Sequence, residues 1–173
     1  MEEALNNILT RRSIKKFKSD MIPDEILNQI LEAGKSAPTG RGNQSPIIIA
    51  IKNKELRDTL SKMNAEIMGV QMDPFYNAPI VLVVLANKEF PTYIYDGTLV
   101  MENLMLAANA LGIGSCWIHR AKEEFESKEG KEILKNLGIE GNYEGIGHCV
   151  LGYADMIPPP SKPRKENYVY LVD

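Results

Sequence analysis

Two groups of basic residues, far apart in the sequence, are the first candidates for chemistry. The first group, near the N-terminus, contains Arg11, Arg12, Ser13 and Lys15. The second group lies in a proline-rich segment near the C-terminus and contains Lys162, Arg164 and Lys165. Arginine binds phosphate well because its planar guanidinium donates two charge-assisted hydrogen bonds. The two groups could therefore converge on one phosphate. The alternative is a basic surface patch that contacts only solvent.

A loop rich in turn-forming residues is the second candidate. Residues 35–46 read KSAPTGRGNQSP, in which Thr39, Asn43 and Gln44 supply hydroxyl and amide groups. Two glycines in the same loop would let the backbone approach a ligand closely. A plain connection between a helix and a strand explains this composition equally well.

Several familiar motifs are absent from the sequence. It contains neither a G-x-x-x-x-G-K-[ST] phosphate loop nor a G-x-S-x-G nucleophile elbow. The stretches GIGSCW and GIGHCV each contain G-x-G but lack the third glycine of a dinucleotide fingerprint. The spacing of Cys116 and His119 would suit zinc. However, His148 and Cys149 would point to opposite faces of a strand, which disfavours a metal site. If the protein is an enzyme, we expect a bound cofactor to carry the reaction.

Length and composition indicate one globular domain over residues 1–173. Its 20 Lys and Arg against 23 Asp and Glu give a net charge of −3, without the basic excess of a nucleic-acid-binding protein. Two cysteines are too few for a disulfide scaffold. The N-terminus does not resemble a signal peptide, and no apolar run reaches the roughly 18 residues of a membrane span. We therefore expect a cytoplasmic protein without nucleic-acid or membrane partners.

Hydrophobic patterning predicts loosely alternating helices and strands. Helices are expected over residues 2–10, 23–34, 54–68, 98–111 and 123–137, and buried strands over 46–51, 79–86, 112–119 and 145–153. The helix over 98–111 is apolar nearly all round, so we expect it to be central or covered by a second subunit. From about residue 157 the proline-rich tail should be extended, with strand propensity over 168–172.

Taken together, the segments resemble the FMN-dependent nitroreductase family, in its short-chain branch. The matching segments are, in order, RRSIKKF, SAPTGRGNQSP, NAPIVLVV, DGTLVMENLMLAANALGIGSCWI, GHCVLGYAD and PPPSKPRK. They cover nearly the whole chain. The resemblance implies an α+β fold, a three-layer α/β/α sandwich with a mixed central sheet that is completed by dimerisation.

The resemblance also implies contacts to FMN from three basic or polar segments. Arg11, Arg12 and Ser13 would bind the phosphate and ribityl oxygens, and Lys15 would reach the flavin N1/O2 edge, where a cation stabilises developing negative charge. The remaining contacts would come from the tail and from a loop that reaches the partner subunit's flavin: Lys162, Arg164, Pro38, Thr39, Gly40 and Gln44. The loop departs from the family pattern at Gly42, where the family has asparagine, and Asn43 follows one position late.

In the family, the GIGSCWI stretch passes the isoalloxazine ring. It would place Trp117, Ile118, His119 and Arg120 beside FMN, although Trp117 could be ordinary core and His119 a structural histidine. Longer relatives carry Glu-Gly at positions 119 and 120. A further apolar set could form either core or a mobile flap over the flavin: Met63, Met68, Met72, Phe75 and Tyr76.

These observations favour an FMN-bound homodimeric oxidoreductase that works by a ping-pong mechanism. NAD(P)H would deliver hydride to FMN, leave, and be replaced by a nitroaromatic, quinone or related acceptor. No side chain needs to act as acid or base. The alternative is a non-catalytic FMN-binding redox sensor or flavin reservoir, because the bulk of Arg120 could block the pocket. Reductive dehalogenation or flavin-dependent oxidation are further reactions that the fold would allow.

Overall fold

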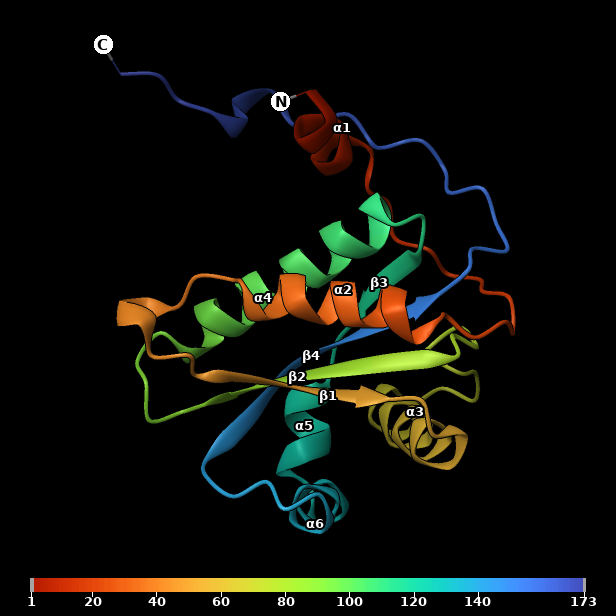
Figure 1. Ribbon diagram of the computed structural model, residues 1–173, viewed down its shortest axis with the longest axis vertical. Helices are drawn as coiled ribbons and strands as arrows, with labels where there is room; N and C mark the ends of the chain where they lie inside the picture. The colour runs from red at the N-terminus through yellow and green to blue at the C-terminus, as the bar shows by residue number, and fades with distance from the viewer. Residues whose placement is uncertain (1, 173) are drawn as a thin grey trace.

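The computed structural model describes residues 2–172 and shows a four-stranded sheet between two layers of helices (Figure 1). The strand order is β1-β2-β4-β3, formed by β1 (Pro46–Ile51), β2 (Ile80–Asn87), β3 (Gly114–Ile118) and β4 (Tyr143–Gly152). The helices are α1 (Glu2–Thr10), α2 (Asp24–Lys35), α3 (Lys54–Met68), α4 (Tyr93–Ala110), α5 (Ala121–Glu126) and α6 (Lys128–Asn136), with short 3-10 turns η1 (Gly40–Gly42) and η2 (Glu166–Tyr168). The expected α+β sandwich is confirmed.

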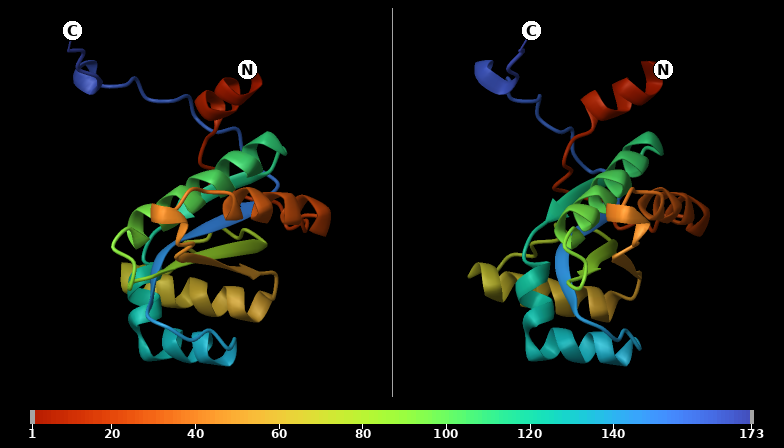
Figure 2. Two further views of the ribbon diagram at one scale, coloured as in Figure 1. Left: turned by 60° about the vertical axis from the view of Figure 1, so that its left-hand side comes forward. Right: turned by 90° about the vertical axis from the view of Figure 1, so that its left-hand side faces the viewer.

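Strand β2 divides the core into two halves because it is buried on both faces. Val81 and Val83 pack with residues of α3, α5 and α6, whereas Leu82 and Val84 pack with residues of α2 and α4. Successive side chains of a strand point to opposite faces, so each helical layer receives alternate residues of β2. Figure 2 shows the two layers from the side. Because both faces of β2 are buried, its residues are apolar without interruption, and this explains the unbroken apolar run in the sequence.

The sheet differs from the expectations in two respects. A mixed sheet was expected, but all pairings among the four strands are antiparallel. Within residues 2–172, the only parallel pairing is an isolated bridge between Ser13 and Ser115. The strand Pro46–Ile51 was expected to be buried but is mostly half-exposed. It pairs with β2 alone and is therefore an edge strand, which apolar composition does not reveal.

The helix predicted over 123–137 is in fact two helices, α5 and α6. Ser127 between them has an extended backbone, and its hydroxyl accepts a hydrogen bond from the N–H of Gly130 at 3.0 Å. A side chain at Gly130 would collide with the carbonyl oxygen of Glu124, since a Cβ atom there would lie 2.1 Å from it. This close approach lets α6 turn away from α5, and the capping serine is the local signal for the break.

Several apolar surfaces remain uncovered in the single chain, among them the start of α4 and the tail. Helix α4 begins at Tyr93, five residues before the prediction, and exposes Ile94 and Tyr95 near its start. The tail forms no strand over 168–172, contrary to the prediction. After η2 it is irregular and exposed, and it extends away from the body at the end where α1 lies (Figures 1 and 2).

No helix within the described part of the chain is long and apolar enough to span a bilayer.

Candidate functional site

The N-terminal basic segment is attached to the free edge of β3. The backbone N–H of Ile14 donates to the carbonyl oxygen of Ser115 at 2.9 Å, and Ser13 forms the parallel bridge to the same residue. Further along, the N–H of Lys18 donates to the carbonyl oxygen of Tyr153 at 2.9 Å. Ile14 is buried, so its neighbour Ser13 is directed outward, as expected for extended chain.

This attachment concentrates positive charge beside β3. Burial raises the pKa of the Cys116 thiol, and a hydrogen bond with Ser13 and the charges of Lys15 and Arg11 oppose that rise in part. The pairing of Ser13 and Ile14 with Ser115 thus brings the basic segment against the start of β3. Arg11 Nη1 is buried and has no hydrogen-bond partner within residues 2–172, while its Nε lies 4.0 Å from Glu102. A buried guanidinium nitrogen without a partner is the feature that an anionic ligand would satisfy.

The other predicted basic residues have different surroundings. Arg12 lines a cavity with Ser115, Asn109 and Pro158. The tail starts beside the basic segment, because the N–H of Asp155 donates to the carbonyl oxygen of Lys16 at 3.0 Å. Beyond that point, the predicted tail residues Lys162 and Arg164 are exposed. Neither of them forms an ion pair with another described residue. Arg12 therefore lies beside the strand residue that pairs with Ser13, whereas Lys162 and Arg164 lie in the exposed tail.

Residues at the end of β3 adopt a tight turn into α5. Trp117 is half-buried and packs over Gly147, where a Cβ atom would lie 2.6 Å from its Nε1. Ile118 is buried and His119 is exposed, so His119 is not a buried structural histidine. Arg120 has φ 78°, in the left-handed region that side chains rarely adopt.

A buried polar network lies behind this turn, and the sequence gives no local sign of it. Asn64, on α3, donates to the carbonyl oxygen of His119 at 2.8 Å and also to the carboxylate of Glu124. The second oxygen of Glu124 lies 2.9 Å from Nε2 of His148. Asn64, Glu124 and His148 are fully buried. The network joins α3, α5 and β4 to the turn, and its members are too far apart in sequence for local patterning to reveal them.

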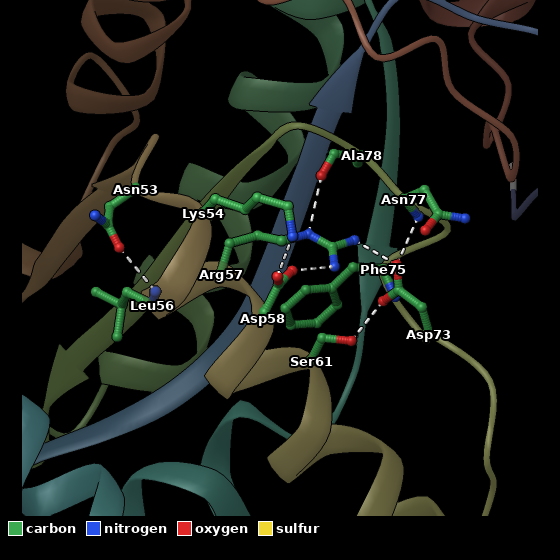
Figure 3. Close-up of polar contacts among 10 residues, drawn as sticks. All are labelled: Asn53, Lys54, Leu56, Arg57, Asp58, Ser61, Asp73, Phe75, Asn77 and Ala78. Atoms are coloured by element: carbon green, nitrogen blue, oxygen red, sulfur yellow. Dashed lines mark hydrogen bonds and ion pairs between the residues drawn. The ribbon is translucent and has the colours of Figure 1, made fainter.

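A second acidic residue fixes the loop between α3 and β2 (Figure 3). The carboxylate of Asp73 accepts hydrogen bonds from Arg57 and Ser61 on α3 and from the backbone N–H groups of Phe75 and Asn77. Burial would raise the pKa of Asp73, but these four hydrogen bonds outweigh it and lower the pKa. The loop backbone is thereby tied directly to α3.

The fixed loop places Tyr76 next to the basic segment. Tyr76 has φ 54°, and the Lys15 ammonium lies 6.0 Å from the centre of its ring. Of the apolar residues considered as a flap, Met63 and Phe75 belong to the buried core, whereas Met68 and Met72 are exposed. The flap itself stays a prediction.

The loop after α2 lies elsewhere on the molecule. It contributes to a cavity of about 790 Å³ whose lining includes Pro38, Thr39, Gly42 and Gln44. Asp96, which is buried on α4, anchors the loop by accepting from the N–H of Gly40 at 2.9 Å and from Ser45 Oγ at 2.7 Å. One chain does not bring this loop to the segment 11–15 (Figure 1). Within residues 2–172, no cluster of His, Cys, Asp and Glu could hold a metal ion.

Comparison with known proteins identifies the family. Residues 8–71 and 66–153 match the model of the Nitroreductase family. The chain belongs to the Nitroreductase family. A relative from Archaeoglobus fulgidus, named provisionally as an NADH dehydrogenase/NAD(P)H nitroreductase, is 35% identical over 158 residues, covering 88% of this chain and 86% of the relative. The Vibrio harveyi NADPH-flavin oxidoreductase is 27% identical, covering 98% of this chain and 72% of that protein.

Solved structures of nitroreductases agree with the fold of the chain. A Bacteroides fragilis nitroreductase with bound FMN superposes with a TM-score of 0.89 at 28% identity, covering 100% of both chains. A Desulfitobacterium hafniense nitroreductase with bound FMN gives a TM-score of 0.88 at 29% identity, covering 99% of this chain and 100% of that chain. Most of the chain, tail included, therefore has a counterpart in these nitroreductases.

The Asp73 hydrogen bonds predict a pH dependence of stability. The folded-state pKa of Asp73 is lowered, so the ionised carboxylate stabilises the fold fully at pH values above its unfolded-state pKa of about 4. This stabilisation is lost as the pH falls from there through the lower, folded-state pKa. Asp73→Asn should lower the free energy of unfolding by about 2 kcal/mol at pH 7, with a smaller difference near pH 3. Urea unfolding across this range measures both quantities.

Asp58→Asn is the matched control, because Asp58 is half-exposed and also accepts a hydrogen bond from Arg57. It should change the free energy of unfolding by less than about 1 kcal/mol. Equal losses in the two variants, or a loss in Asp73→Asn that persists at low pH, would contradict the role given to Asp73.

Proposed function

We propose that the protein is an FMN-dependent NAD(P)H oxidoreductase of the nitroreductase type. The observation that carries this proposal is the buried, unpartnered Nη1 of Arg11, in the same chain segment as Ser13 and Lys15. A phosphate would give this nitrogen an anionic acceptor, and Ser13 and Lys15 would add a hydroxyl and a cation. FMN carries such a phosphate, so the residues fit the cofactor that the similar nitroreductase structures contain.

Each part of the chain then has a definite task. When bound, FMN would supply the ring that accepts hydride from NAD(P)H and passes electrons to an acceptor. Lys15 would hold a positive charge near the ring, in a position that Tyr76 limits from one side. The turn at His119 and Arg120 would border the ring beyond β3. The tail would add a second phosphate clamp through Lys162 and Arg164.

We propose that NAD(P)H and the acceptor, a nitroaromatic or a quinone, use one site in turn. This order gives ping-pong kinetics. Hydride transfer itself requires orientation and a nearby positive charge, but no side-chain acid or base. Substrate protonation can come from water.

Three features support a homodimer with FMN at its interface. The loop with Pro38, Thr39, Gly40 and Gln44 cannot meet the Arg11 segment of its own chain, so a partner subunit would bring the two together. Helix α4 exposes Ile94 and Tyr95, and the tail exposes a run of apolar side chains. The edge of β1 has no strand beside it within residues 2–172. A second copy would cover these surfaces.

Arg120 also favours a second candidate, a non-catalytic FMN-binding sensor or reservoir. It is a long, half-buried side chain at a turn that would border the ring. The two functions differ in one assay. An oxidoreductase oxidises NAD(P)H with a stoichiometric quinone or nitroaromatic, and its double-reciprocal plots are parallel, whereas a sensor binds FMN but does not turn over.

The Arg11 proposal predicts a specific loss of cofactor affinity. Arg11→Gln should weaken FMN binding by about tenfold to a hundredfold, because charge-assisted hydrogen bonds to the phosphate are lost. The dissociation constant is measured by flavin fluorescence quenching in the apoprotein. Lys131→Gln, an exposed charge change on α6, is the control and should bind FMN like the wild type. A dissociation constant unchanged in Arg11→Gln would contradict the phosphate role.

The homodimer proposal predicts the effect of removing the end of the tail. A chain that ends at Lys165 keeps the proposed phosphate clamp but lacks the exposed apolar segment. We expect it to lose the dimer or to form it much more weakly, because apolar area buried between subunits is lost. Light scattering after size-exclusion chromatography measures the mass. A wild-type monomer, or a truncated chain that remains fully dimeric, would contradict the role of this segment.

A further inference from the structure

Arg120 combines an unusual backbone with a fixed side chain. Its φ of 78° is a left-handed conformation that costs a non-glycine residue energy and persists only where the surroundings enforce it. Its carbonyl oxygen accepts the N–H of Glu124 at 3.1 Å, the first bond of α5. Glycine would adopt this conformation without strain. The presence of arginine here therefore calls for an explanation in its side chain.

Asn64 determines where that side chain lies. Its Nδ2 holds the carbonyl oxygen of His119, and its Oδ1 faces Arg120 Nη1 at 3.5 Å. Asn64 is itself fully buried and fixed by Glu124. The buried amide thus holds the backbone of the turn and makes one long contact with the guanidinium.

The charge of Arg120 is not neutralised by the residues around it. Among residues 2–172 it forms no ion pair, although Glu124 lies in the same network. The Glu124 carboxylate is shared between His148 and Asn64 instead. A guanidinium carries five N–H donors, and the contact with Asn64 engages only one nitrogen. The remaining donors are available to an anion.

Arg120 follows the C-terminal end of β3, whereas the basic segment pairs with the start of the strand at Ser115, and the α3–β2 loop lies between them. His148 pairs with Ile118 in the sheet, and its ring lies 5.0 Å from that of Phe75. The next residue, Tyr76, lies beside Lys15. A continuous set of contacts therefore connects the Arg120 turn with the Lys15 segment around the strand.

We infer that Arg120 is a specificity-determining residue that favours electron acceptors bearing a carboxylate or sulfonate, and that Asn64 is its positioning residue. The inference rests on the proposed FMN-dependent activity and adds the acceptor class to it. The fixed guanidinium would bind the acidic group of the acceptor through charge-assisted hydrogen bonds. Binding of this acidic group would give Arg120 a role other than blocking the pocket.

The test compares acceptors that differ by one acidic group in the FMN-loaded enzyme. 1,2-Naphthoquinone and 1,2-naphthoquinone-4-sulfonate are assayed with wild type, Arg120→Gln and the exposed charge control Lys131→Gln. In Arg120→Gln, kcat/KM for the sulfonate should fall about tenfold more than kcat/KM for the neutral quinone. Lys131→Gln should leave both unchanged. For each acceptor, kcat/KM of a variant is divided by kcat/KM of the wild type, so that the different intrinsic reactivities of the two quinones cancel.

A binding measurement provides a readout independent of turnover. Benzoate and benzamide are titrated against oxidised holoenzyme, and the dissociation constants are taken from changes in the flavin absorbance. Arg120→Gln should weaken benzoate about tenfold and leave benzamide nearly unchanged, and Arg120→Lys should recover part of the difference because it restores the charge.

Two further variants separate specificity from structure. Arg120→Gly should lose the preference for anions while keeping or raising the melting temperature, because it removes the backbone strain. Asn64→Ala should reduce the preference although Arg120 is present, and adding Arg120→Gln should reduce it little further.

Equal effects of Arg120→Gln on charged and neutral compounds, or no effect on either, would overturn the inference. A holoenzyme that turns over without any preference for anions would overturn it while leaving the proposed function intact. A protein that binds no FMN would overturn the proposed function first.

Discussion

The hydrogen bond from Ile14 N–H to the carbonyl oxygen of Ser115 sets the register of the basic segment against the sheet. Along extended chain, a shift of one residue would exchange inward and outward side chains. Ile14 is buried between exposed Ser13 and Lys15, so such a shift would expose Ile14 and draw its two polar neighbours inward. The apolar residue therefore fixes the place of the polar ones. The candidate phosphate site follows from this register.

Three buried or half-buried carboxylates then hold the segments around the sheet. Asp73 fixes the loop before β2, Asp96 the loop after α2, and Glu124 the network behind the turn after β3. A carboxylate removed from water is stable only when several donors surround it, so each one ties together segments that are distant in sequence. Loops that lack regular pairing thereby obtain the fixed geometry that a cofactor site requires.

Much of the fold could be predicted because its local signals are strong. The apolar run of β2 is buried on both faces, and α2 and α3 begin and end close to the predicted residues. The half-exposure of β1 could not be predicted, since it depends on which strand lies beside it. The break at Ser127 depends on the close approach of Gly130 to Glu124, which composition does not report.

At the site, the local motif Arg11, Ser13 and Lys15 was found from sequence because its members are neighbours in the chain. Asn64 carried no signal, since its partners His119 and Glu124 are more than fifty residues away. The sequence predicts Tyr76 only as part of the core or of a flap over the flavin, and its place beside Lys15 comes from the hydrogen bonds of the Asp73 loop. Resemblance to a family indicated the cofactor class, whereas positioning residues required the structure.

The visible absorbance spectrum of the purified protein, together with the mass and amount of any released cofactor, tests the flavin assignment most directly. We expect a yellow protein that releases about one FMN per chain, or apoprotein that regains the spectrum when FMN is added. A colourless protein that takes up no added FMN would contradict the assignment. Arg11 and Lys15 would then be basic residues without a cofactor to bind.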